Sequence, residues 1–69
     1  MNSKEKKSYI NLIVDYPLIS IRNKEELKKA QDRIDKVLLI PRPDKGQMAY
    51  LEALSDLVFL AEKDLKVLD

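Results

Sequence analysis

The stretch that decides the fold lies at residues 44–61 and reads DKGQMAYLEALSDLVFLA. Asp44 and Gln47 are three residues apart, which is the spacing of a capping box at the start of a helix. Within residues 48–61, eleven of the fourteen side chains are apolar. A helix that covers one side of a core needs only an apolar stripe. The segment therefore predicts a helix over residues 45–66 that is buried on more than one side.

The apolar residues of this predicted helix fall on two faces. Helical spacing gives a first face of Leu51, Leu54, Val58 and Ala61. The apolar surface extends beyond that face through Tyr50, Leu57 and Leu60. One partner helix can cover the first face only. Two coverings fit the second: a second copy of the chain or another protein, or residues 3–22 of the same chain.

The preceding segment predicts an amphipathic helix over residues 24–39. Asn23 and Glu26 form a close variant of the capping box at its start. Two prolines follow within residues 40–44, which are expected to form a stiff turn and to make the two helices an antiparallel hairpin. The expected core of the hairpin is Leu27, Ala30, Ile34, Val37, Leu38, Leu51, Leu54, Leu57 and Val58.

The first part of the chain is less decisive. Residues 3–16 fit a helix through the spacing of their aromatic and aliphatic side chains, but alternate residues fit a strand equally well. Residues 1–7 are polar and are expected to form a frayed, solubilising start. Residues 17–22 begin with a proline and are predicted to be an extended connector. The side chains expected to tuck under the helices are Leu18, Ile19 or Ile21.

Composition limits the chemistry that the chain can perform. Its 69 residues have room for one small domain, residues 1–69. The 13 basic and 12 acidic residues give a net charge of +1, and there is no Cys and no His. These counts exclude a disulfide, a Cys/His zinc site, a thiol nucleophile and an imidazole base. We therefore expect no catalytic residues, no cofactor and no metal.

Three further features of the sequence bear on function. Asp32 with Asp35, and Glu52 with Asp56, have the spacing of acid–base pairs or hard-metal ligands, but solvated charged helix faces explain them better. The basic residues that could meet phosphates are Lys4, Lys6, Lys7 and Arg22. With so small a net charge, direct DNA binding is disfavoured. The absence of a long apolar run or a signal-peptide pattern predicts a cytoplasmic protein without a membrane span.

A spaced pattern covers about residues 9–62. It consists of Pro17-Leu18, Ile21, Asn23-Lys24-Glu25-Glu26-Leu27, Ala30, Ile34-Asp35 and Tyr50-Leu51-Glu52-Ala53-Leu54-Ser55-Asp56-Leu57-Val58. This pattern resembles the amino-terminal helical region of HigA-type antitoxins from HigBA toxin–antitoxin modules. The resemblance implies a helix for residues 3–16. It also implies a protein that neutralises an mRNA-cleaving toxin. In that family a helix-turn-helix domain, which we do not expect within residues 1–69, represses the protein's own operon.

The chain departs from that family near its end. Ala61 stands where an aromatic residue is usual ahead of Glu62, and Phe59 occupies a commonly polar position. The resulting prediction is an all-α domain of three helices that acts through protein contacts. We expect a homodimer, a ribonuclease toxin as a partner, or both; the alternative is a DNA-associated regulator fragment or accessory dimerisation protein. The residues predicted at the protein interface are Tyr50, Leu57, Phe59 and Leu60.

Overall fold

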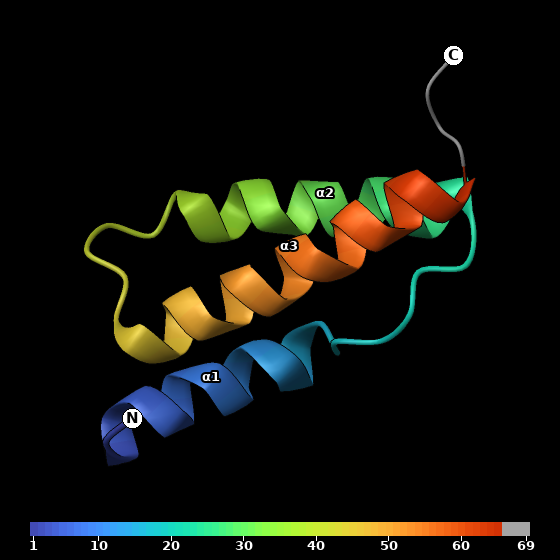
Figure 1. The fold of residues 1–69 in the computed structure, drawn as a ribbon. Coiled ribbons are helices and arrows are strands. Elements are labelled where there is room, and N and C mark those ends of the chain that lie inside the picture. Colours follow the sequence, from blue (N-terminus) through green and yellow to red (C-terminus); the bar gives the residue numbers. More distant parts are fainter. Residues whose placement is uncertain (66–69) are drawn as a thin grey trace.

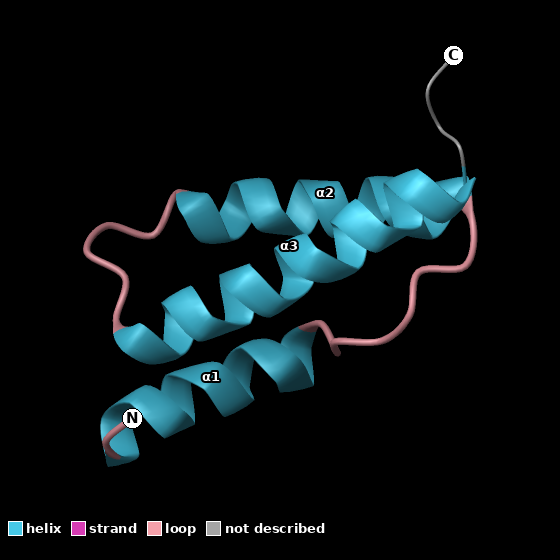
Figure 2. Ribbon diagram, in the orientation of Figure 1, coloured by secondary structure: helices cyan, strands magenta, loops and turns pink. Residues whose placement is uncertain are grey.

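The computed structural model describes residues 1–65, which form the helices α1 (Ser3–Asp15), α2 (Lys24–Leu38) and α3 (Lys45–Leu65) (Figure 1). This part of the chain contains no strand, so the prediction of an all-α, three-helix fold is confirmed (Figure 2). The predicted helix end at residue 66 lies outside the described residues.

The third helix is the central element of the fold. Helix α2 runs antiparallel to α3, as the hairpin prediction requires, and α1 lies along α3 in the same direction (Figure 1). Within the described residues, the backbones of α1 and α2 each pack against α3 and not against each other. One side of α3 is therefore covered by α1 and an adjoining side by α2.

Side-chain caps fix the starts of α2 and α3. The Asn23 side chain accepts a hydrogen bond from the backbone N–H of Glu26 at 2.8 Å, while the Glu26 carboxylate accepts from the backbone of Arg22 at 2.8 Å. Asp44 and Gln47 complete a reciprocal box, with N–O distances of 2.8 and 2.9 Å. The bonds from the backbone of Glu26 and Gln47 satisfy donors that the first turn of a helix leaves free, and the other two hold the residues that lead into each helix. Both predicted caps are confirmed.

A capping box also fixes the start of α1. Asn2 and Glu5 form a complete capping box, with both N–O distances at 2.9 Å, and residues 3–7 are helical. The helix expected over residues 3–16 thus begins at Ser3, and the fraying expected for residues 1–7 stays a prediction. The helix begins there for a local reason: the box satisfies two free backbone groups and holds the first turn in place.

The turn between α2 and α3 contains one unusual backbone conformation. Arg42, between Pro41 and Pro43, has a φ of 52°, in the left-handed region that non-glycine residues seldom adopt. The two flanking prolines restrict the chain to few other conformations. The turn predicted at residues 40–44 is thus built from fixed dihedral angles rather than from a glycine.

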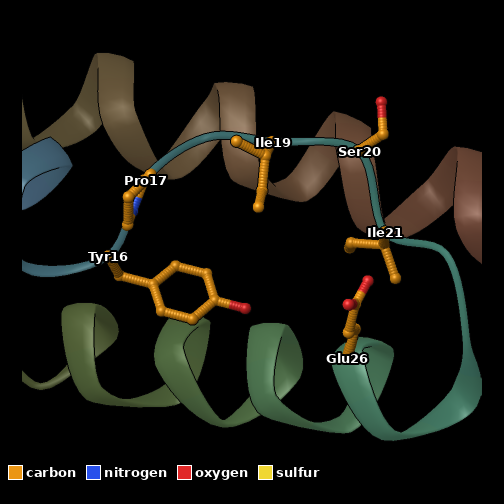
Figure 3. A pocket seen from close by; sticks show the side chains of 6 residues that line it. All are labelled: Tyr16, Pro17, Ile19, Ser20, Ile21 and Glu26. Carbon is orange, nitrogen blue, oxygen red and sulfur yellow. The ribbon is translucent and has the colours of Figure 1, made fainter.

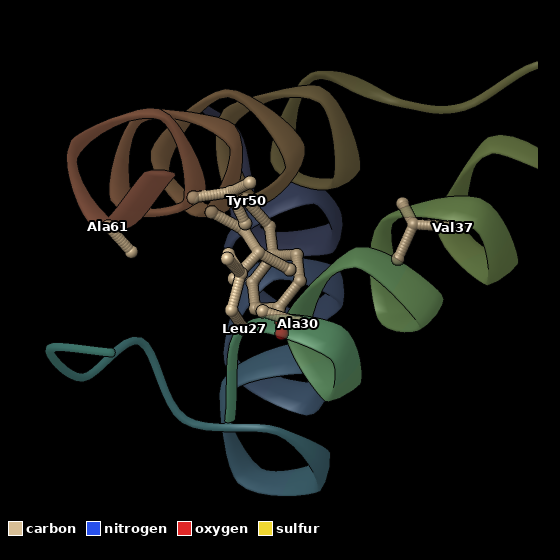
Figure 4. Close-up of a cluster of buried hydrophobic side chains, with 7 residues drawn as sticks. Leu27, Ala30, Val37, Tyr50 and Ala61 are labelled. Carbon is tan, nitrogen blue, oxygen red and sulfur yellow. The ribbon is translucent and has the colours of Figure 1, made fainter. Parts of the chain in front are cut away.

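The core lies where the inner side of α3 meets its two partners. Its buried apolar side chains are Leu27, Ala30, Val37, Tyr50, Leu54, Val58 and Ala61 (Figure 4). Around them lie partly buried side chains from all three helices and the loops, including Tyr9, Leu12, Ile13, Ile34 and Leu51. Leu57, also predicted for the core, is half-buried.

The prediction that Leu38 belongs to the core is wrong. Leu38 is 61% exposed, although its neighbour Val37 is 4% exposed. Each residue of an α-helix is rotated by about 100° from the one before it. Because Val37 points at α3, the side chain of Leu38 turns toward solvent at the end of α2.

The connector after α1 contributes to the core in part. Leu18 and Ile21 are partly buried against the core cluster, whereas Ile19 is 61% exposed. Of the three candidates for tucking under the helices, two do so. The stretch is extended, as its proline predicts, and leads from the end of α1 to the start of α2 (Figure 1).

Candidate interaction surface

The structure separates the four residues predicted at a protein interface. Tyr50 is 0% exposed and Leu57 is half-buried. Phe59 and Leu60 are 66% and 54% exposed. Tyr50 therefore belongs to the interior of a single chain and has no surface to offer a partner, which corrects its assignment to the interface.

Tyr50 is held by partners within the chain. Its ring meets that of Tyr9 on α1 edge to face, with a centroid distance of 6.5 Å, and its hydroxyl donates to the backbone carbonyl of Tyr16 at 2.6 Å. Of the two possible covers for this part of α3, the structure shows the one within the chain, because α1 and Tyr16 contact the Tyr50 side chain. Burial raises the pKa of the Tyr50 hydroxyl, and the nearby Arg33 guanidinium opposes that rise.

Arg33 is a residue whose position the sequence did not reveal. It lies on α2, yet its side chain is only 17% exposed and forms an ion pair with Asp15 at the end of α1. A cation beside the carboxyl end of a helix is favourable because that end carries a partial negative charge. With Tyr50, this pair links all three helices through polar groups. Because Arg33 and Asp15 pair with each other within the fold, we assign this cluster no ligand.

The side of α3 that faces away from α1 and α2 forms the candidate surface, here called the α3 outer face. Helical spacing and exposure define its members as Met48, Glu52, Ser55, Asp56, Phe59, Leu60 and Lys63. Met48 is 51% exposed, so it adds a third large apolar side chain to Phe59 and Leu60. Sequence reasoning missed Met48 as a surface residue, although its spacing of eleven residues from Phe59 places both on one side of the helix.

A hydrogen bond marks one edge of the α3 outer face and a shallow hollow marks the other. On the side of α2, the Gln31 amide donates to the Glu62 carboxylate at 3.0 Å. On the side of the connector, Leu57 and Leu60 line a shallow hollow of about 120 Å³ together with Ser20, Ile21, Ala61 and Asp64. Between these edges, α3 has no cover from the described residues over the middle of its outer side.

A second shallow hollow lies under the connector, where Tyr16, Pro17, Ile19, Ser20, Ile21 and Glu26 line about 120 Å³ (Figure 3). Its one charged side chain, Glu26, already accepts from the Arg22 backbone and lies 3.7 Å from the Arg22 guanidinium. Because that carboxylate is occupied by the chain's own groups, the hollow presents no free charge to a ligand.

The remaining candidates do not converge on a site. Asp32, Asp35, Glu52 and Asp56 are all exposed on helix surfaces. In the part of the chain that the structure describes, no three acidic, Cys or His residues are grouped to hold a metal ion. None of the helices described combines the length and apolarity that crossing a bilayer demands.

The basic residues are also dispersed. Lys4, Lys6 and Lys7 are exposed on the first turns of α1, whereas Arg22 precedes α2. The starts of α1 and α2 lie at opposite ends of the molecule (Figure 1). Arg22 is moreover paired with Glu26. These four residues therefore form no continuous positive surface.

Comparison with known proteins leaves this geometry as the main guide to function. The chain matches no family model, no curated protein and no solved structure.

Proposed function

We propose that this chain is an antitoxin-like helical module that acts by protein contact through the α3 outer face. The observation that carries the proposal is the 66% exposure of Phe59 on a helix whose inner side is already packed. A phenylalanine left in water forgoes roughly 1.5–3 kcal/mol of available burial. Together with Met48 and Leu60, it makes this face the natural place for a partner.

The type of partner follows from the resemblance to HigA-type antitoxins. In such a module, the helical region contributes to self-association, to binding of a ribonuclease toxin, or to both. The three-helix fold and the two predicted caps are consistent with that interpretation. We place the protein in the cytoplasm, where such a toxin would cleave mRNA. We assign it no catalytic role because the paired carboxylates Asp32 with Asp35 and Glu52 with Asp56 are exposed on helix surfaces.

The test uses the product of the adjacent reading frame, where that frame encodes a small basic ribonuclease-like protein. Phe59→Glu should weaken co-purification and equilibrium binding by tenfold or more, because the new charge would have to be buried unpaired. Leu39→Glu is the matched control: Leu39 is 82% exposed and lies at the end of α2, away from this face. Equal binding by wild type and Phe59→Glu would contradict the proposal.

The alternative, a DNA-associated regulator, makes a different prediction about salt. Each phosphate contact makes binding fall steeply with ionic strength, whereas association through apolar side chains responds little. Binding of an operator fragment that falls steeply with salt and depends on Lys4, Lys6 and Lys7 would favour the regulator. The dispersal of the basic residues favours the protein-contact module.

A further inference from the structure

We propose that the α3 outer face binds a second copy of this chain, with the two α3 helices antiparallel and the two-fold axis between Phe59 and Leu60. The inference rests on the proposed function, because it uses the same surface, and it adds the occupant and the alignment of the two helices. Three observations carry it: the exposure of the apolar pair, the order of charges along the face and the edges that bound it.

The apolar pair lies at the centre of the proposed contact. Phe59 and Leu60 are adjacent in sequence and both more than half exposed. Neighbouring residues of a helix lie about 100° apart, so they occupy opposite flanks of the outer face. A two-fold axis between them brings Phe59 beside its symmetry mate on one flank and Leu60 beside its mate on the other. Both side chains are then covered by like side chains.

The charges along the face are complementary under that symmetry. Asp56 lies three residues before Phe59, and Lys63 lies three residues after Leu60. In the antiparallel arrangement, Asp56 of one chain therefore faces Lys63 of the other, about 5 Å along the axis from the centre. Symmetry repeats the pair on the other side, and Glu52 lies one turn beyond Asp56 to support the same lysine.

The parallel alignment brings like charges together. Parallel α3 helices would set Asp56 against Asp56 and Lys63 against Lys63, which is unfavourable. The two remaining acids of this region do not disturb the antiparallel pairing. Glu62 is held toward α2 by Gln31, and Asp64 lines the hollow on the connector side. The centre of the face therefore carries Asp56 before the apolar pair Phe59 and Leu60, and Lys63 after it.

The experiment is sedimentation equilibrium on the full chain from about 10 to 500 μM, because a contact built mainly on one helix is expected to be weak. A dimer is expected for wild type and a monomer for Phe59→Glu. Asp56→Lys and Lys63→Glu should each weaken the dimer by about tenfold, and the double variant should restore it to near the wild-type affinity. Asp35→Lys, on the exposed side of α2, is the charge-reversal control and should leave the dimer unchanged.

The outcomes separate the two proposals. All substituted side chains are exposed, so each variant should keep its helical circular dichroism, and Leu60→Glu repeats the test at a second position. A wild-type monomer throughout the range would overturn the second copy as occupant, while the toxin assay would still test the function. A dimer unaffected by both Phe59→Glu and Leu60→Glu would place the contact elsewhere. Failure of the double charge swap to restore the dimer would overturn the antiparallel alignment.

Discussion

Tyr50 combines an apolar ring and a polar hydroxyl in one buried position. The sequence places it among the apolar residues of α3 without indicating whether the hydroxyl finds a partner. In the structure it does, because the carbonyl of Tyr16 follows the last turn of α1 and accepts its hydrogen bond at 2.6 Å. A buried tyrosine is tolerated when its hydroxyl is bonded in this way.

Tyr50→Phe should therefore destabilise the chain while leaving its packing almost intact. The variant keeps the ring that meets Tyr9 but leaves the Tyr16 carbonyl without this donor, at an expected cost of about 1–3 kcal/mol in the free energy of unfolding. Urea denaturation at neutral pH, followed by circular dichroism, measures the difference. Tyr9→Phe is the control, and a Tyr50→Phe variant as stable as wild type would mean that the hydrogen bond contributes nothing net.

The same substitution has a pH dependence of known sign. Burial raises the pKa of Tyr50 above its ordinary value of 10.0. The unfolded chain then ionises first as pH increases, so the stability due to the protonated tyrosine is full below about pH 10 and is lost above it. The difference in unfolding free energy between wild type and Tyr50→Phe should shrink in that range. A difference that grows with pH would contradict this assignment.

Among the helices, α3 contributes the most buried residues to the core. Two leucines that the sequence equally predicts for the core, Leu54 on α3 and Leu38 on α2, differ greatly in burial. Leu54→Ala removes a side chain that is 1% exposed and should cost about 2–5 kcal/mol, close to the whole stability of so small a domain. Leu38→Ala removes one that is 61% exposed and should change the melting temperature little. Thermal melts of the two variants, measured side by side, provide the comparison. Equal shifts would show that the packing described here is wrong.

The reason the sequence could predict the helices but not every core residue is physical. Caps at Asn23 and Asp44 are local interactions between residues three apart, and prolines act on their immediate neighbours, so both are legible in sequence. Whether Leu38 or Gln31 lies nearer α3 depends on how α2 is rotated against its partner, which no local pattern determines. Periodicity left residues 3–16 open between helix and strand for a different reason, because their apolar side chains fit both the helical and the alternating spacing.

The candidate surface was predicted in part. Phe59 and Leu60 are exposed, as an interface requires before its partner binds, whereas Tyr50 is taken up by α1. The apolar residues of α3 that α2 does not cover therefore fall into two groups. One part is covered within the chain, and the other forms the α3 outer face. Only the position of α1 decides between them, and α1 is the element that the sequence defined least.

In the whole molecule, α1 is the least buried helix and its approach to α3 depends on one glycine. No residue of α1 is fully buried, and its backbone packs against α3 alone among the described helices. Gly46, near the start of α3, lies so close that an added Cβ would clash with the carbonyl oxygen of Glu5. It would also lie 2.8 Å from the Glu5 carbonyl carbon and 3.2 Å from the Tyr9 nitrogen. These are backbone atoms, so they cannot move aside as a flexible side chain could.

Gly46→Ala should therefore weaken the docking of α1, even though alanine favours a helix over glycine by about 1 kcal/mol. We expect a net loss of about 1–3 kcal/mol, as for other overpacked positions. In the variant, amide hydrogen exchange should become faster in residues 3–15 than it is in wild type, and the change should be larger there than in α2. The reason is that local opening exposes the helix that has no buried residue. Ser55→Ala, at an exposed position of α3, is the control. A Gly46→Ala chain that is more stable than wild type, with α1 exchange unchanged, would show that α1 does not approach α3 at this glycine.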